Sequence, residues 1–112
     1  MTQEQAIERV GKAAERALKD TVYHGTRLLW GDNYHTVKEQ LDYALASRIG
    51  GRNLYNRVNG YFCHYATVHR IEAIQNGVRM MYQVTFVCTI DGKQEVLTAE
   101  NTIEARGKSK RA

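Results

Sequence analysis

Apolar and polar residues alternate along the segment from Tyr61 to Ala99, which is the pattern of half-buried β-strands. Asn76-Gly77 and Asp91-Gly92 interrupt this alternation. Both dipeptides are typical of type I′ turns, because the two central residues of such turns need positive φ. The flanks are rich in β-branched and aromatic residues, which favour strands. The pattern predicts a three-stranded antiparallel meander over 61–99, around which the rest of the chain is organised.

The same alternation predicts which strand residues face the core. In the first strand Val68 and Arg70 fall on one face, since side chains two apart in a strand point the same way. In the second strand one face is apolar and should be buried, while the opposite face is half-polar. The apolar face carries Met80, Tyr82, Val84, Phe86 and Cys88. Because neither face of the sheet is wholly polar, we expect the second one to meet a helix, another subunit or a ligand.

Two stretches with helical periodicity precede the meander, over residues 1–20 and 33–50. Capping boxes begin both helices, Thr2 with Gln5 and Thr36 with Glu39, and a glycine pair ends the second. The apolar stripe of the first helix is mostly alanine, and small residues bury little area each. This stripe therefore predicts either a self-association surface, on which another helix could approach closely, or an ordinary surface helix.

The remaining segments complete the expected fold. Thr21–Asn33 reads as a short edge strand or an extended loop. Residues 100–107 read as a short helix, with Asn101 or Thr102 as its cap and Gly107 as its stop, before a basic tail over 108–112. The expected fold class is α+β, in one domain of 112 residues: a three- to four-stranded antiparallel meander packed with two amphipathic helices and a short C-terminal helix.

The net charge is +4, and its distribution is uneven. From Arg48 to Arg79 the sequence contains five arginines but a single acidic residue, Glu72, and the tail adds more basic residues. Arginine suits planar, bidentate recognition of phosphate, and several of the seven tyrosines lie among these arginines. Aromatic faces stack bases while guanidinium groups hold phosphates, so the combination favours an anionic partner such as a nucleotide or a nucleic acid.

The sequence carries no catalytic signature. The four histidines have no acid or nucleophile at a fixed spacing, and the two cysteines match no zinc pattern and read as buried apolar residues. Tyr23-His24-Gly25-Thr26 resembles the dinucleotide-binding motif of ADP-ribosyltransferases, but no downstream glutamate motif follows it. We expect no enzyme, no metal and no cofactor. The longest apolar runs are far below the ~20 residues that span a bilayer, so we expect a cytoplasmic protein without a membrane partner.

The order of elements resembles the small phage anti-Thoeris sponge proteins: a small N-terminal helix, a Trp-Gly turn into a second helix, a twisted meander and a short final helix. The strings that carry the resemblance are Gly25-Thr26-Arg27, Trp30-Gly31-Asp32-Asn33, Tyr82-Gln83-Val84-Thr85-Phe86 and Glu95-Val96-Leu97-Thr98-Ala99-Glu100.

This resemblance implies a homo-oligomer in the host cytoplasm that sequesters a cyclic ADP-ribose-type signal, or a cyclic oligonucleotide, without hydrolysing it. It implies that Arg27 and Arg106 bind phosphates and that an aromatic residue near Tyr82 stacks the adenine, with Phe86 and Thr98 completing the ligand-binding set. Two alternatives stay open. One is a small basic nucleic-acid-binding or anti-restriction or anti-CRISPR protein. The other is a protein inhibitor that docks through the second face of the sheet or through the alanine-rich helix.

Overall fold

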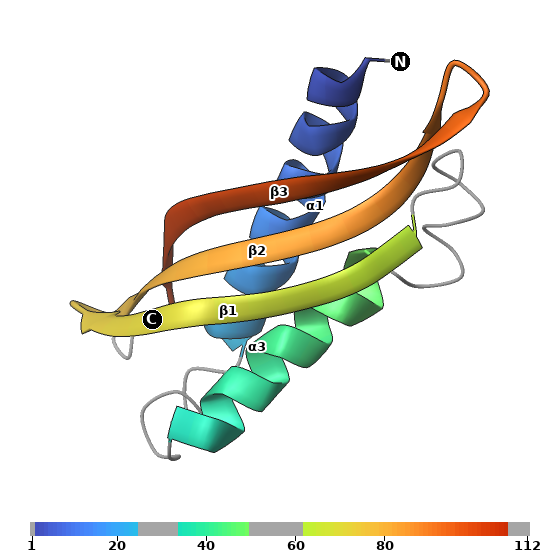
Figure 1. Cartoon of the computed structure of the whole chain (residues 1–112). Coiled ribbons are helices and arrows are strands. Elements are labelled where there is room, and N and C mark those ends of the chain that lie inside the picture. The colour runs from blue at the N-terminus through green and yellow to red at the C-terminus, as the bar shows by residue number, and fades with distance from the viewer. Residues whose placement is uncertain (1, 25–33, 50–61, 108–112) are drawn as a thin grey trace.

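In the part of the chain that the structure describes, a layer of two helices packs against a three-stranded sheet (Figure 1). The computed structural model describes residues 2–24, 34–49 and 62–107. Its elements are α1 (Gln3–His24), α3 (Tyr34–Ile49), β1 (Phe62–Ile74), β2 (Gly77–Ile90) and β3 (Lys93–Arg106). The strands are antiparallel in the order β1-β2-β3. The expected α+β fold, with two helices followed by an antiparallel meander, is confirmed.

Helix α1 begins with the predicted capping box. The Thr2 amide donates to Gln5 Oε1 at 2.9 Å and the Gln5 amide donates to Thr2 Oγ1 at 3.1 Å, which satisfies two amides at the helix start. The helix extends to His24, so the strand or loop expected from Thr21 is wrong for residues 21–24. Val22 lies on the buried stripe of α1, and helix formation therefore buries it. The rest of that expectation, over 25–33, lies outside the described residues.

The two β-turns differ in their backbone geometry. Asp91 and Gly92 both have positive φ, 52° and 79°, as the type I′ prediction requires. At the other turn Ile74 pairs with Gly77, so the central residues are Gln75 and Asn76, and only Asn76 has positive φ, at 58°. The predicted Asn76-Gly77 turn is therefore wrong by one residue, and Gly77 is the first residue of β2.

Strand β3 continues through residues 100–106, so the predicted C-terminal helix is wrong. Its register with β2 is unbroken, from Ile90 opposite Lys93 to Gly77 opposite Arg106. Ile103 and Ala105 alternate with exposed neighbours and reach the core. Strand pairing thus supplies both the backbone partners and the burial that a two-turn helix would have lacked.

The inward face of β2 is the predicted core face, since all five expected residues are buried there. In β1 the register shifts between Cys63 and Tyr65 and again between Val68 and Arg70, as β-bulges produce. Val68, before the second shift, faces the core, whereas Arg70, after it, is exposed on the other face. The expectation that these two residues share a face is wrong, because a bulge inserts one extra residue into the alternation.

The alanine stripe of α1 packs inside the protein. Ala6, Ala14 and Ala17 are buried in the core that α1 forms with β3, β2 and α3. Small side chains let the helix axis lie close to the sheet, while Leu18 and Val22 supply larger apolar groups. The stripe predicted as a self-association surface is therefore already covered by the protein's own sheet and second helix.

Helix α3 is fastened to the edge strand β1 by polar contacts. Asp42 Oδ1 accepts a hydrogen bond from the Val68 amide at 2.7 Å, while Asp42 Oδ2 lies 2.5 Å from Lys38 Nζ. Lys38 Nζ also donates to Thr67 Oγ1 at 3.1 Å. An edge strand presents backbone groups that need partners, and Asp42 supplies one of them.

Candidate functional site

The sheet has one covered and one uncovered face among the described residues. Helices α1 and α3 lie on one side of it, and no described helix lies on the other (Figure 1). On β2 the side chains of the uncovered face are exposed or half-buried, beginning with Arg79 and Met81. This uncovered face is where a ligand or partner has access to the sheet.

A network of charged side chains lies on the uncovered face near the β1–β2 turn; it comprises Arg70, Glu72, Arg79, Glu104 and Arg106, and we call it the Arg–Glu cluster. Arg70 Nη2 lies 2.5 Å from Glu72 Oε1, and Arg79 Nη1 lies 3.6 Å from Glu72 Oε2. Arg79 Nε and Nη2 both donate to Glu104 Oε2, at 3.0 and 2.7 Å. Three arginines against two glutamates leave the Arg–Glu cluster with an excess of positive charge.

Register places these charges together. The short turn at Gln75-Asn76 sets Glu72 opposite Arg79, and the β2–β3 register sets Arg79 opposite Glu104. Side chains directly opposite on one face of a sheet lie close enough to interact. Arg106, at the end of β3, donates from Nη1 to the Gln75 carbonyl at 2.6 Å and so connects the Arg–Glu cluster to the turn.

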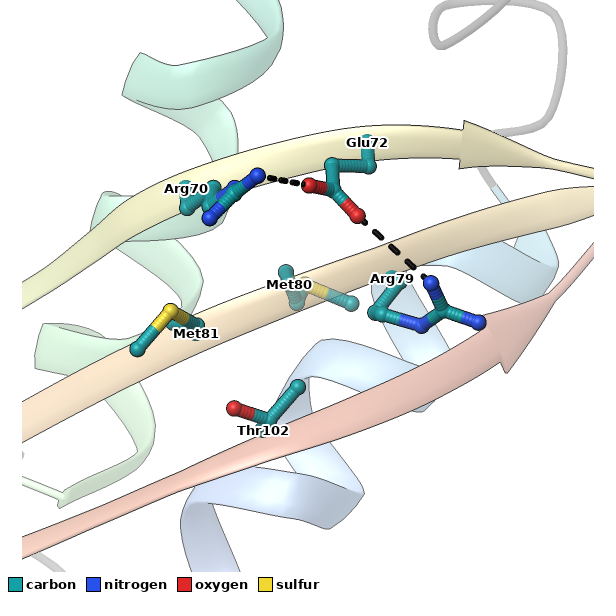
Figure 2. A pocket seen from close by; sticks show the side chains of 6 residues that line it. All are labelled: Arg70, Glu72, Arg79, Met80, Met81 and Thr102. Carbon is teal, nitrogen blue, oxygen red and sulfur yellow. Dashed lines mark ion pairs between the residues drawn. The ribbon is translucent and has the colours of Figure 1, made fainter.

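A hollow of about 210 Å³ opens beside these charges. Figure 2 shows Arg70 and Glu72 on β1, Arg79 on β2 and Thr102 on β3, with Glu72 between the two guanidinium groups. Met80 and Met81 complete its lining. The hollow therefore combines guanidinium donors, one carboxylate, one hydroxyl and thioether surface, which suits an anionic group attached to a partly apolar one.

The charged groups stabilise each other's ionised forms. Hydrogen bonding and Coulombic attraction from Arg79 hold the pKa of the Glu104 carboxyl below its usual range. The same contacts with Glu104, helped by Glu72, raise the pKa of Arg79. Both residues are therefore charged at neutral pH, and the ion pair between Arg79 and Glu104 is a stable electrostatic feature of this face.

A second groove, of about 250 Å³, lies between α1 and β3 and contains the Tyr82 hydroxyl. That hydroxyl lies 3.4 Å from the Gly11 carbonyl, to which it donates. Burial, with a smaller contribution from Glu15, raises the pKa of Tyr82 to about 12. The groove walls include Glu8 and Glu100, so they are predominantly acidic and disfavour a phosphate.

The four predicted site residues that the structure describes do not lie together. Tyr82 and Phe86 are buried on the inward face of β2, against the helices. Thr98 is exposed on the uncovered face, where its hydroxyl lies 3.3 Å from that of Thr85. Arg106 lies in the Arg–Glu cluster at the end of β3, and Arg27 lies outside the described residues. Of the four described residues, only Arg106 and Thr98 face the side on which the hollow opens.

Sequence reasoning missed Arg70, Glu72, Arg79 and Glu104 as a group, although a signal for them exists. Once the Gln75-Asn76 turn is fixed, counting outward along both strands reaches Glu72 and Arg79 together. Counting outward from Asp91-Gly92 in the same way reaches Arg79 and Glu104. Register arithmetic from the two turns therefore predicts this constellation.

The described part of the chain gives little support to metal binding or to catalysis by a cysteine. Within it, no group of three or more His, Cys, Asp or Glu side chains is arranged to hold a metal ion. Cys88 is a free, buried thiol, and burial raises its pKa, so it is a poor nucleophile. Neither described helix is long and apolar enough to cross a bilayer.

Comparisons with models of known protein families, with curated proteins and with solved structures found no match.

Proposed function

We propose that this protein binds and sequesters a small phosphorylated nucleotide, without converting it, on the uncovered face of its sheet. The observation that carries the proposal is the position of Arg70 and Arg79, which reach one hollow from adjacent strands. The choice of a cyclic ADP-ribose-type signal, and with it an anti-defence role in phage infection, comes from the resemblance to anti-Thoeris sponge proteins.

Arginine geometry supports a phosphate as the recognised group. A guanidinium presents donors in a fixed planar fork that matches phosphate oxygens, and charge-assisted hydrogen bonds are stronger than neutral ones. The Arg70 side chain is 67% exposed, so its donors are accessible from solvent. Arg79 is held in place by Glu104, which lowers the entropic cost of presenting its remaining donors to a ligand.

The size of the hollow supports a homo-oligomer. Its volume, about 210 Å³, is below the roughly 300–1,000 Å³ of typical small-molecule sites. One chain can hold a phosphoryl group there but encloses only part of a nucleotide. We propose that a second copy of the chain supplies the rest of the pocket, with the aromatic stacking surface that the resemblance implies.

Calorimetric titration with cyclic ADP-ribose, ADP-ribose and cyclic dinucleotides tests the proposal. Arg70→Gln and Arg79→Gln should each weaken binding by about 10-fold or more, because a hydrogen bond to a charged group contributes about 1.5–3 kcal/mol. Arg16→Gln, an equal change of charge at an exposed position of α1, is the matched control and should leave the affinity unchanged.

Two results would contradict the proposal. One is the absence of any binding by the unmodified protein at millimolar ligand. The other is an equal loss of affinity in the Arg16→Gln control, which would indicate a general charge effect. Chromatography of the ligand recovered after heat denaturation of the protein should show that it is chemically unchanged. A cleaved product would indicate an enzyme instead.

A single-stranded nucleic acid is the second candidate, because the uncovered face also carries Tyr65, a residue that is 53% exposed. Exposed aromatic rings beside arginines are the usual platform for unstacked bases. This candidate predicts affinity that rises with oligonucleotide length and falls steeply with salt, since each phosphate contact releases counterions. A small-nucleotide binder should instead show a shallow salt dependence.

A further inference from the structure

Glu72 lies where a bound phosphate would make its contacts. Its carboxylate stands between two guanidinium groups, with Oε1 2.5 Å from Arg70 Nη2 and Oε2 3.6 Å from Arg79 Nη1 (Figure 2). The first distance is that of a close ion pair, whereas the second is longer than a hydrogen bond. Glu72 therefore bridges the two arginines asymmetrically, and its hold on Arg79 is weak.

Arg79 is fixed from the opposite side. Its Nε and Nη2 both donate to Glu104 Oε2, at 3.0 and 2.7 Å, so the plane of the guanidinium is set from β3. The remaining nitrogen, Nη1, is directed to Glu72, and both residues line the hollow. Arg79 is thus pre-organised, with one donor edge offered to whatever anion occupies the space between β1 and β2.

We infer that Glu72 is an intramolecular competitor for this phosphate site and that ligand binding displaces its carboxylate. The inference rests on the proposed function and adds how the site is regulated. The pyrophosphate of a cyclic ADP-ribose-type ligand carries two negative charges spread over several non-bridging oxygens, against one charge on a carboxylate, so it can accept from Arg70 Nη2 and Arg79 Nη1 together. The Glu72 side chain is 36% exposed, and a rotation about its side-chain bonds moves the carboxylate into solvent.

The electrostatic consequence has a definite sign. The Glu72 carboxylate neutralises part of the positive charge of Arg70 and Arg79 that attracts an incoming phosphate, and it repels that phosphate at close range. Removing the carboxylate should therefore tighten binding, although it removes an ion pair of the folded protein. A merely structural ion pair makes the opposite prediction, since its loss would disorder Arg70 and weaken any anion site there.

Titration of Glu72→Gln with inorganic pyrophosphate and with cyclic ADP-ribose is the test. The amide keeps the shape of the side chain and removes its charge, and we expect the dissociation constant to fall by about three- to tenfold relative to the unmodified protein. Glu100→Gln is the matched control: it removes an equal charge on β3, opposite Gln83, outside the hollow, and should change the affinity less than twofold. Glu72→Asp keeps the charge but, with its shorter side chain, holds it farther from Arg79. The affinity should therefore lie between those of the unmodified protein and Glu72→Gln.

Two outcomes separate the inference from the proposed function. Binding by the unmodified protein with no gain in Glu72→Gln over Glu100→Gln would overturn the inference alone. No binding of either probe by the unmodified protein and by Glu72→Gln would overturn the proposed function together with it. Thermal unfolding of each variant, measured beside the titrations, verifies that the protein compared is folded.

Discussion

Gly77 lies in close contact with the backbone of the neighbouring strand β3. A Cβ at this residue would lie 2.1 Å from the carbonyl oxygen of Ala105, and the clashing atoms belong to backbone on the neighbouring strand. Gly77→Ala should therefore force β2 and β3 apart at the turn and destabilise the protein by about 2–3 kcal/mol. Urea unfolding monitored by circular dichroism measures the loss.

Gly92→Ala is the control for the loss of a glycine. Gly92 has a φ of 79°, but nothing lies within 4 Å of an added Cβ. Its cost is the strain of the left-handed conformation alone, about 1 kcal/mol. Equal destabilisation by the two substitutions would show that the close approach at Gly77 is not what limits β2.

Single residues also show what the sequence could predict of the site. The inward face of β2 follows from alternation, and the same alternation excludes Tyr82 and Phe86 from the uncovered face once α1 and α3 cover the other. The resemblance to anti-Thoeris sponge proteins implies that these two residues bind a ligand. In the single chain, however, both are buried on the face of the sheet opposite the hollow. Glu72 and Arg79 were readable from the turn, because a two-residue loop fixes which side chains face each other.

At the scale of elements, the attachment of α3 to β1 depends on Asp42. Asp42→Ala leaves the Val68 amide without its partner and should cost about 1–2 kcal/mol. Hydrogen exchange of the Val68 amide should accelerate more than exchange in the centre of β2, since the edge opens locally. Native-state exchange measured by NMR resolves the two.

Two matched variants sharpen that experiment. Asp42→Asn keeps an oxygen acceptor for the Val68 amide while losing the charge that faces Lys38, so it should cost less than Asp42→Ala. Glu39→Ala alters an exposed position one turn away and should leave Val68 exchange unchanged. Equal effects of Asp42→Ala and Glu39→Ala would mean that the polar attachment contributes nothing.

The prediction of a helix over residues 100–106, where the structure has a strand, is wrong for a physical reason. Asn101, Thr102 and Gly107 are local helix signals, and local signals cannot report that β2 begins at Gly77 and needs a partner of equal length. The same limit explains the turn at Gln75-Asn76. A glycine after an asparagine suits the central positions of a type I′ turn, but here Gly77 follows the turn, because the backbone of β3 leaves no room for a side chain there. Long-range pairing decides both cases.

At the scale of the whole molecule, the proposed homo-oligomer is the expectation that most needs a measurement. Light scattering coupled to size exclusion should give a mass above one chain, and cyclic ADP-ribose should stabilise that assembly, because a ligand shared between subunits favours association by mass action. A mass of one chain both with and without ligand would contradict a pocket shared between two copies.

Periodicity of the first helix predicted its buried face but not what covers that face. The small side chains of Ala6, Ala14 and Ala17 suit packing against a helix of a second copy as well as against the protein's own sheet, because both kinds of packing bring the two backbones close together. The choice depends on where β3 runs, and β3 is about 90 residues away in the sequence. Fold class is thus predictable from pattern here, whereas interfaces are not.

The packing of α1 on β3 also constrains how the chain is made. The ribosome synthesises α1 early and β3 last among the described elements, so the apolar stripe of α1 lacks its main contact surface until β3 has emerged from the exit tunnel. The two hairpins, by contrast, join strands that are neighbours in sequence and can pair within microseconds. During synthesis, therefore, α1 is the segment that chaperones should recognise, and completion of β3 is the event that releases it.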